Sequence, residues 1–160
     1  MHVKPGMPLG TFLQTIHLRT NLPEGVPLEF TVSGVVVSDV SLLGGNYSAS
    51  RRLLSLGTVQ RSTGTKSMMR AVIKGPYHND VKLTLKSVEP ENGLHVTIGD
   101  PSPLGEGATM FPISVEIPPG TEPMNRLGGD KQGDYGKILI ETTHPDAKLL
   151  RVMVRFAVAE

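Results

Sequence analysis

Ile138-Leu139-Ile140-Glu141-Thr142-Thr143-His144-Pro145 follows the pattern of an earlier stretch, Ile16-His17-Leu18-Arg19-Thr20-Asn21-Leu22-Pro23, at an offset of 122 residues. The same offset relates Leu28-Glu29-Phe30-Thr31-Val32 to Leu150-Arg151-Val152-Met153-Val154. In both copies, alternating apolar residues flank a proline-containing segment, which is typical of two strands joined by a turn. The sequence therefore predicts the same β-hairpin twice.

The N-terminal copy is expected to be the end of an incomplete repeat. His2-Val3-Lys4-Pro5-Gly6 resembles Glu116-Ile117-Pro118-Pro119-Gly120, but at an offset of 114 residues, so the second copy carries eight extra residues before its hairpin. We interpret residues 1–37 as the C-terminal strands of a preceding repeat. Residues 38–160 are then one complete domain.

Further strands are predicted between the two hairpins. Alternation of apolar and polar residues is clearest in two runs, Val81-Leu83-Leu85 and Leu94-Val96-Ile98. Residues 53–59, 67–74 and 110–117 also read as strands. The chain is punctuated by 13 prolines and 18 glycines, and no segment keeps the apolar period of a helix. This pattern predicts an all-β fold: an Ig-like antiparallel β-sandwich with an extra N-terminal strand pair.

Several local details follow from individual residues. Alternation along residues 28–33 places Leu28, Phe30 and Val32 on an inward side. Gly57 is expected to end the strand before it, and residues 44–50 read as a loose connection. Pro112 cannot donate a hydrogen bond to a ladder, so its strand should be an edge strand or contain a bulge.

Composition argues against several classes of function. Aromatic residues make up 4% of the 160 residues and Trp is absent, which disfavours stacking surfaces for sugars or single-stranded nucleic acid. The 16 basic and 15 acidic residues form no long run of one sign, so no nucleic-acid groove is expected. The absence of cysteine excludes disulfides and thiolate sites. No apolar run reaches the ~18 residues that span a bilayer, so membrane insertion is not expected in this chain.

Metal-ligating residues are present but are not clustered in the sequence. The loop Gly128–Asp134 resembles glycine-aspartate calcium loops, although a single copy with Lys131 at its centre favours a solvated hairpin loop. Surface positions are expected for the histidines, which show no ligand spacing: His2, His17, His78, His95 and His144. Met68, Met69 and Met110 could suggest copper ligation, but methionine in strands more often fills a core. We predict no metal or cofactor site.

A wider set of turn glycines and strand residues resembles a known family. The motifs are Leu56-Gly57-Thr58-Val59, Lys74-Gly75 after a strand, Pro118-Pro119-Gly120, and Gly136-x-Ile138-x-Ile140-x-Thr142 before a final strand. They are similar to a bacterial domain-of-unknown-function family of Ig-like repeats, which is related to the Hydin and ASH-like domains and occurs in tandem in envelope proteins. Residues 53–158 resemble a full repeat, and residues 2–36 resemble the end of a preceding one.

The resemblance implies a seven-stranded sandwich and a periplasmic, cell-surface or secreted location. It brings no catalytic residues, and the chain departs from the family in its long insertion at 120–136 and in having no cysteine early in the domain. The implied function is that of a non-catalytic structural module, one tandem repeat of a larger bacterial envelope or secreted protein.

No catalytic constellation is predicted. A serine hydrolase of the common type needs a Gly-x-Ser-x-Gly turn, which the chain lacks. Ser33 and Ser55 fall within or beside predicted strands instead. Asn46-Tyr47-Ser48 matches a glycosylation acceptor, which means little in a bacterial chain. We therefore predict that the protein is not an enzyme.

The N-terminal strand pair is expected to need a protein partner. A lone hairpin is marginal in water, and ordering about 35 residues costs roughly 35 to 70 kcal/mol of backbone entropy. We expect it to pack on a neighbouring repeat or on a second copy, in a strand-exchanged homodimer through residues 10–37. The alternative function is a binding module that recognises a peptide or protein partner through a sheet edge or the long loops 99–107 and 120–136.

Overall fold

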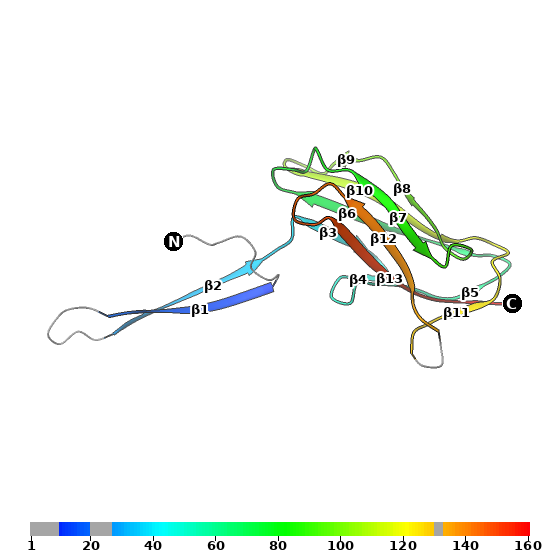
Figure 1. Ribbon diagram of the computed structural model, residues 1–160, viewed down its shortest axis with the longest axis horizontal. Helices are drawn as coiled ribbons and strands as arrows, with labels where there is room; N and C mark the ends of the chain where they lie inside the picture. Colours follow the sequence, from blue (N-terminus) through cyan, green and yellow to red (C-terminus); the bar gives the residue numbers. More distant parts are fainter. Residues whose placement is uncertain (1–9, 20–26, 130–132) are drawn as a thin grey trace. The chain divides into compact units, whose positions relative to one another are not determined.

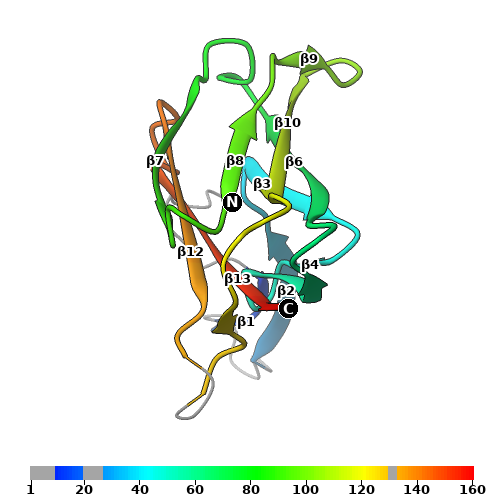
Figure 2. The same ribbon diagram turned by 90° about the vertical axis from the view of Figure 1, so that its right-hand side faces the viewer.

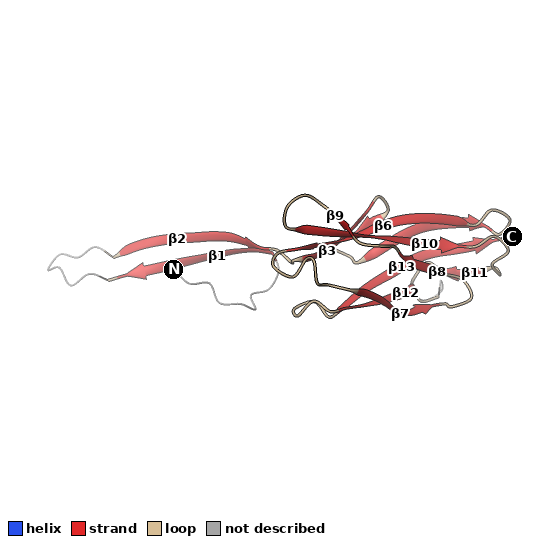
Figure 3. Cartoon of the chain, turned by 90° about the horizontal axis from the view of Figure 1, so that it is seen from above, coloured by secondary structure: helices blue, strands red, loops and turns tan. Residues whose placement is uncertain are grey.

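The structure, a computed structural model, describes residues 10–19, 27–129 and 133–160 of the chain. These residues form several β-sheets and no helix, as Figure 3 shows. The all-β class predicted from the sequence is therefore confirmed. The chain divides into two units, residues 1–38 and residues 39–160, and a separate two-stranded sheet belongs to the first.

The first unit contains an antiparallel hairpin of β1 (Gly10–Leu18) and β2 (Leu28–Val36) (Figure 1). Ile16 lies opposite Phe30, and Leu18 lies opposite Leu28. Because successive side chains of a strand point to opposite faces, these four side chains share one face of the hairpin. The first predicted hairpin is thus confirmed, while the resemblance noted for residues 2–6 lies outside the described residues.

The second unit consists of two sheets that form two layers, as Figure 2 shows. The first sheet has the order β3-β6-β10-β8, with β9 beside β10. Its strands are β3 (Val40–Gly44), β6 (Thr65–Lys74), β8 (His95–Ile98), β9 (Ser102–Pro103) and β10 (Ala108–Ile117). The second has the order β4-β5-β13-β12-β7, with β11 beside β13. Its strands are β4 (Tyr47–Ser48), β5 (Leu53–Gln60), β7 (Leu83–Glu89), β11 (Met124–Arg126), β12 (Gly136–Thr142) and β13 (Leu149–Ala159).

The core of the second unit is filled by apolar side chains from both sheets. Along β10, every second residue from Phe111 to Ile117 is buried. On the other sheet, Ile138, Val154 and Phe156 are buried in the same cluster. This alternation follows the sequence pattern, since each strand turns its apolar side to the facing sheet. All buried members of the core cluster lie between Val40 and Val158, so the described core belongs to the second unit alone.

A bulge interrupts β5, so the prediction that this strand ends at Gly57 is wrong. β5 runs parallel to β13, with Ser55 opposite Arg155 and Gly57 opposite Phe156, which leaves Leu56 as an extra residue. Gly57 has a φ of 73°, a conformation that glycine adopts without steric strain. The glycine therefore allows the strand to continue through the bulge to Gln60.

β10 is a central strand, so the expectation that Pro112 lies in an edge strand is wrong. Its register with β6 is even, whereas the register on the other side shifts by one residue between Met110 and Ile113. Pro112 lies opposite Arg70 of β6. On the other side β10 pairs with β9 at residues 109–110 and with β8 from Ile113 onward. The Pro112 carbonyl accepts a hydrogen bond from the Gly99 N–H at 2.8 Å. Because the nitrogen and carbonyl of a strand residue face the same side, the missing N–H faces the interval between β8 and β9.

Three segments expected to be loops contain short strands. β3 and β4 take up parts of the loose connection at 44–50, and β9 lies within 99–107. β11 lies within 120–136, and its Met124 is opposite Val158 of β13. The sequence does not indicate these strands, because two or three residues are too short to show an alternation pattern.

Candidate functional site

An exposed apolar surface lies on the β1–β2 hairpin, here named the hairpin face. Six apolar side chains lie on one side of the two strands: Phe12, Ile16, Leu18, Leu28, Phe30 and Val32. Gln14, opposite Val32, lies on the same side. Ile16 is 43% exposed and Phe30 is 52% exposed. The sequence placed Leu28, Phe30 and Val32 on an inward side, but in the structure Leu28 and Phe30 are exposed and Val32 is half-buried.

The second copy of the hairpin shows how such a face is buried. β12 and β13 pair Ile138 with Val152, which matches the Ile16–Phe30 pair shifted by 122 residues in each strand. Ile138 is 1% exposed and Val152 is 2% exposed, because they belong to the core between the two sheets. Equivalent positions are therefore buried in one copy and exposed in the other.

The opposite side of the hairpin is mainly polar. His17 Nδ1 lies 2.9 Å from Glu29 Oε1 in an exposed cross-strand pair. Thr15 lies opposite Thr31 on the same side, and Leu13 is its exposed apolar residue. Exposed ion pairs contribute little to stability. The apolar surface is thus concentrated on the hairpin face.

The outer edges of the hairpin have no partner strand within the described residues, because its sheet contains only β1 and β2. The equivalent strands of the second unit do have partners, since β12 pairs with β7 and β13 pairs with β5. An unpaired edge presents backbone N–H and C=O groups to which another strand can bind. The hairpin therefore offers both an apolar face and two edges for interaction.

The histidines occupy separate parts of the fold, and His2 lies outside the described residues. His17 and His95 are exposed on β1 and β8, as expected. His78 Nδ1 lies 3.1 Å from Thr109 Oγ1. No group of three or more His, Cys, Asp or Glu residues that could hold a metal ion occurs among the residues that the structure describes.

His144 is buried, so the prediction of a surface position is wrong for this residue. Its Nδ1 accepts a hydrogen bond from the Asp146 N–H at 3.2 Å, and its own N–H donates to Thr142 Oγ1 at 2.8 Å. The ring meets Tyr77 edge to face, with centroids 5.7 Å apart, while Nε2 has no hydrogen-bond partner. His144 thus serves as part of the β12–β13 turn, where no alternation pattern could have indicated its burial.

The calcium-like loop and the methionines do not form a site together. Residues 130–132 of the loop Gly128–Asp134 lie outside the described residues, and the Gly128 N–H donates to the Gly133 carbonyl across the loop at 3.0 Å. Met69 is buried in the core, in line with its expected role as a filler. Met68 is exposed, which contradicts that expectation, and Met110 is half-buried.

The serines and the acceptor motif also lie apart. Ser33 is exposed on β2 and Ser55 is exposed on β5. Tyr47, in the motif Asn46-Tyr47-Ser48, is half-buried against the core. Burial raises the pKa of Tyr47 above 10.0, and the positive charge of Arg52 partly opposes this shift.

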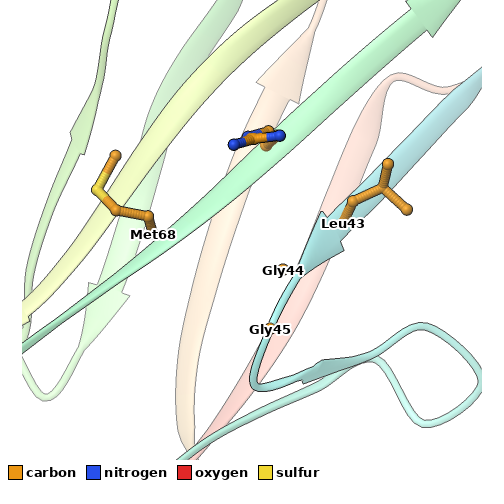
Figure 4. A pocket seen from close by; sticks show the side chains of 5 residues that line it. Leu43, Gly44, Gly45 and Met68 are labelled. Atoms are coloured by element: carbon orange, nitrogen blue, oxygen red, sulfur yellow. The ribbon is translucent and has the colours of Figure 1, made fainter.

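An open pocket of about 320 Å³ lies beside β3 and β6. Figure 4 shows Leu43 and Met68 on two sides of it, with Gly44 and Gly45 at the end of β3. The fifth lining residue, Arg70, is exposed and is its only charged group. Since Leu43 and Met68 are each more than half exposed, the pocket is a shallow depression of the sheet surface.

The loops proposed for partner recognition are partly used in the fold. β9 fixes residues 102–103 of the loop 99–107 to β10, and β11 fixes residues 124–126 of the segment 120–136 to β13. Leu104 is the exposed large apolar residue of the first loop. The described parts of these loops thus offer less free surface than the sequence suggested.

Comparison of the chain with protein-family models, with curated proteins and with solved structures finds no match. Among the described residues, no helix is long and apolar enough to cross a membrane.

Proposed function

We propose that the chain is a non-catalytic structural and interaction module, a tandem Ig-like repeat of a larger bacterial envelope or secreted protein. The strand order supports the Ig-like assignment. Seven strands can be lettered A to G in chain order: β3, β6, β7, β8, β10, β12 and β13. The first sheet then has the order A-B-E-D, and the second contains the order G-F-C, as in Ig domains. β5 joins the second sheet as a parallel neighbour of β13.

The observation that carries the tandem-repeat proposal is the recurrence of one hairpin in one register. Ile16 opposite Phe30 becomes Ile138 opposite Val152 when both strands are shifted by 122 residues. A shift of one strand by a single residue would exchange its two faces, so a common register also preserves the apolar face. On this proposal, β1 and β2 are the final two strands of a preceding repeat.

The proposed role follows from faces and edges of sheets. The hairpin face and the unpaired edges of β1 and β2 are surfaces for protein contact, to a neighbouring repeat or to a second copy. The extracytoplasmic location rests on the resemblance to tandem Ig-like repeats. Fractionation of the producing cells with an antibody to this chain tests it, and recovery with the cytosolic proteins would reject that location.

Removal of the hairpin tests the division into repeats. A chain of residues 39–160 should unfold cooperatively, with a Tm within about 3 °C of that of the full chain, because the core cluster lies between Val40 and Val158. Circular dichroism is the suitable probe, since the chain has no Trp. Loss of the cooperative transition would reject a separate second repeat.

A second candidate function, a binding module for an extended peptide, is favoured by the open edges of the β1–β2 sheet. Selection of random peptides on the immobilised chain tests this function. Peptides that bind the full chain but not residues 39–160 would favour it. Failure to select any peptide would reject it.

A further inference from the structure

We propose that the hairpin face is a homodimer interface, on which the β1–β2 hairpin of one chain packs against the same hairpin of a second copy. The two hairpins would be related by a two-fold axis, so that each contributes the same side chains. The inference deepens the proposed function, because it names the partner of the interaction surface.

The composition of the hairpin face allows two copies of this face to pack against each other. Two of its cross-strand pairs, Ile16–Phe30 and Leu18–Leu28, contain only apolar side chains, and the next pair, Gln14–Val32, includes one uncharged polar side chain. The cross-strand pair of His17 and the carboxylate of Glu29 lies on the opposite side. Two copies can therefore approach face to face without bringing like charges together and without burying an unpaired charge.

A second copy of the chain offers a surface that matches the hairpin face. Among the other exposed large apolar residues of the described chain, Leu43 and Met68 line one pocket. The rest are Leu13, Val37, Tyr77, Leu85, Leu104 and Met153. The hairpin face instead gathers four in two adjacent pairs. The same face of another copy is consequently an apolar partner that matches it pair for pair.

The available area suits a concentration-dependent dimer. The four paired side chains Ile16, Leu18, Leu28 and Phe30 are each between 43% and 52% exposed, so each contributes on the order of 100 Å². Eight such side chains, with the flanking Phe12 and Val32, give a buried area of roughly 1,000 Å² in the dimer. This value is near the lower bound for specific interfaces, so we expect a weak dimer that dissociates on dilution.

The second unit shows that this arrangement is stable for the same kind of hairpin. β12 and β13 turn Ile138 and Val152 toward an apolar sheet and bury both nearly completely. Two sheets packed in this way lie about 10 Å apart, with their side chains interdigitated. A second hairpin would supply the opposing layer for β1 and β2.

The test is the mass of the full chain in solution. Sedimentation equilibrium from about 1 μM to about 1 mM should show a monomer–dimer equilibrium for the wild type. The double variant Ile16→Lys/Phe30→Lys should raise the Kd at least about 100-fold, because four charges would meet at the interface. The matched control Thr15→Lys/Thr31→Lys places the same charges on the neighbouring pair of the opposite side, and it should retain the dimer.

A cross-linking measurement guards against a variant whose hairpin does not fold. Because the chain has no cysteine, a single Ile16→Cys substitution introduces a unique thiol. Oxidation should join two chains through Ile16→Cys but not through Thr15→Cys. A disulfide dimer formed equally by both variants would contradict packing through the hairpin face.

The remaining outcomes are decisive as well. A wild-type chain that stays monomeric up to about 1 mM would overturn the proposal, and would assign the face to the chain's own second unit or to a different partner. A dimer that survives Ile16→Lys/Phe30→Lys would also overturn it. Neither outcome affects the proposed repeat function, because that function is tested by the folding of residues 39–160.

Discussion

Gly99 and Pro112 are matched in shape at the centre of the first sheet. The Gly99 N–H donates to the Pro112 carbonyl at 2.8 Å, and a Cβ on Gly99 would lie 2.7 Å from Cγ of the proline ring. Glycine at position 99 thus leaves the space in which a proline can occupy a central strand. The hydrogen bond in turn satisfies the proline carbonyl between β8 and β9.

Gly99→Ala should therefore destabilise the second unit. We expect a loss of about 1 to 3 kcal/mol in the free energy of unfolding, because the rigid proline ring cannot move aside without shifting β10. Urea denaturation followed by circular dichroism measures it. Gly45→Ala is the control, since a Cβ there meets no atom within 4 Å, and it should change the free energy by less than about 0.5 kcal/mol. Equal effects of both substitutions would contradict the steric explanation.

The two copies of the hairpin predict unequal effects of one substitution. Ile138→Ala should cost about 2 to 5 kcal/mol in the unfolding of the second unit, because it leaves a cavity in the core. Ile16→Ala, at the equivalent exposed position, should cost less than about 1 kcal/mol. Thermal or urea unfolding at low protein concentration compares them. A large cost for Ile16→Ala would mean that the hairpin face is buried against the second unit.

The buried histidine predicts a structural effect. His144→Ala should reduce the free energy of unfolding by about 2 to 4 kcal/mol, since it removes the acceptor of the Asp146 N–H and the ring contact with Tyr77. The exposed His95 provides the control, and His95→Ala should change the value by less than about 0.5 kcal/mol. Urea unfolding of both variants checks the difference. Similar stability of the two would show that His144 is exposed in solution.

Ionisation of Tyr47 predicts a loss of stability at high pH. Burial raises its pKa above 10.0, so the folded state favours the neutral phenol. Its contribution to stability is fully present below pH 10 and is lost as the pH rises through the raised pKa. Tyr47→Phe should therefore show a shallower decline in stability between about pH 9 and pH 12.

Arg52→Gln should change the decline of stability with pH in the opposite direction. The positive charge of Arg52 lowers the pKa of Tyr47, so its removal should raise that pKa further and steepen the decline. The urea midpoint at each pH is the quantity to compare. Identical pH profiles for the wild type and Tyr47→Phe would exclude a contribution from this phenol.

The strands were largely predictable from the sequence, because alternation and turn residues are local signals. The repeat gave the hairpin of β12 and β13 as well as that of β1 and β2, and the structure confirms both. Because both strands are shifted by the same offset, the sequence repeat also indicated their pairing register, since Ile16 and Ile138 have equivalent partners. Short elements such as β9 and β11 were missed because their formation depends on a neighbouring strand rather than on their own sequence.

The remaining errors arose from contacts between distant residues. Pro112 favours an edge strand because its nitrogen cannot donate to a neighbouring strand. In β10 that nitrogen faces the break between β8 and β9, which the sequence of β10 alone does not reveal. The ring of His144 contacts that of Tyr77, which lies far from it in the sequence. The hairpin face was assigned an inward side from alternation alone, although alternation says nothing about whether a second layer is present.

The parallel pair of β5 and β13 has a consequence for mechanical load. Met153 is opposite Leu53 and Ala159 is opposite Gln60, so the two strands run side by side in the same direction. If neighbouring domains pull on the two ends of the second unit, β3 and β4, which precede β5, are loaded first; once they are released, β5 and β13 are drawn in opposite directions along their length. Their hydrogen bonds lie across this direction and bear the load together instead of breaking one after another. A unit connected in this way resists stretching better than one whose terminal strands peel apart.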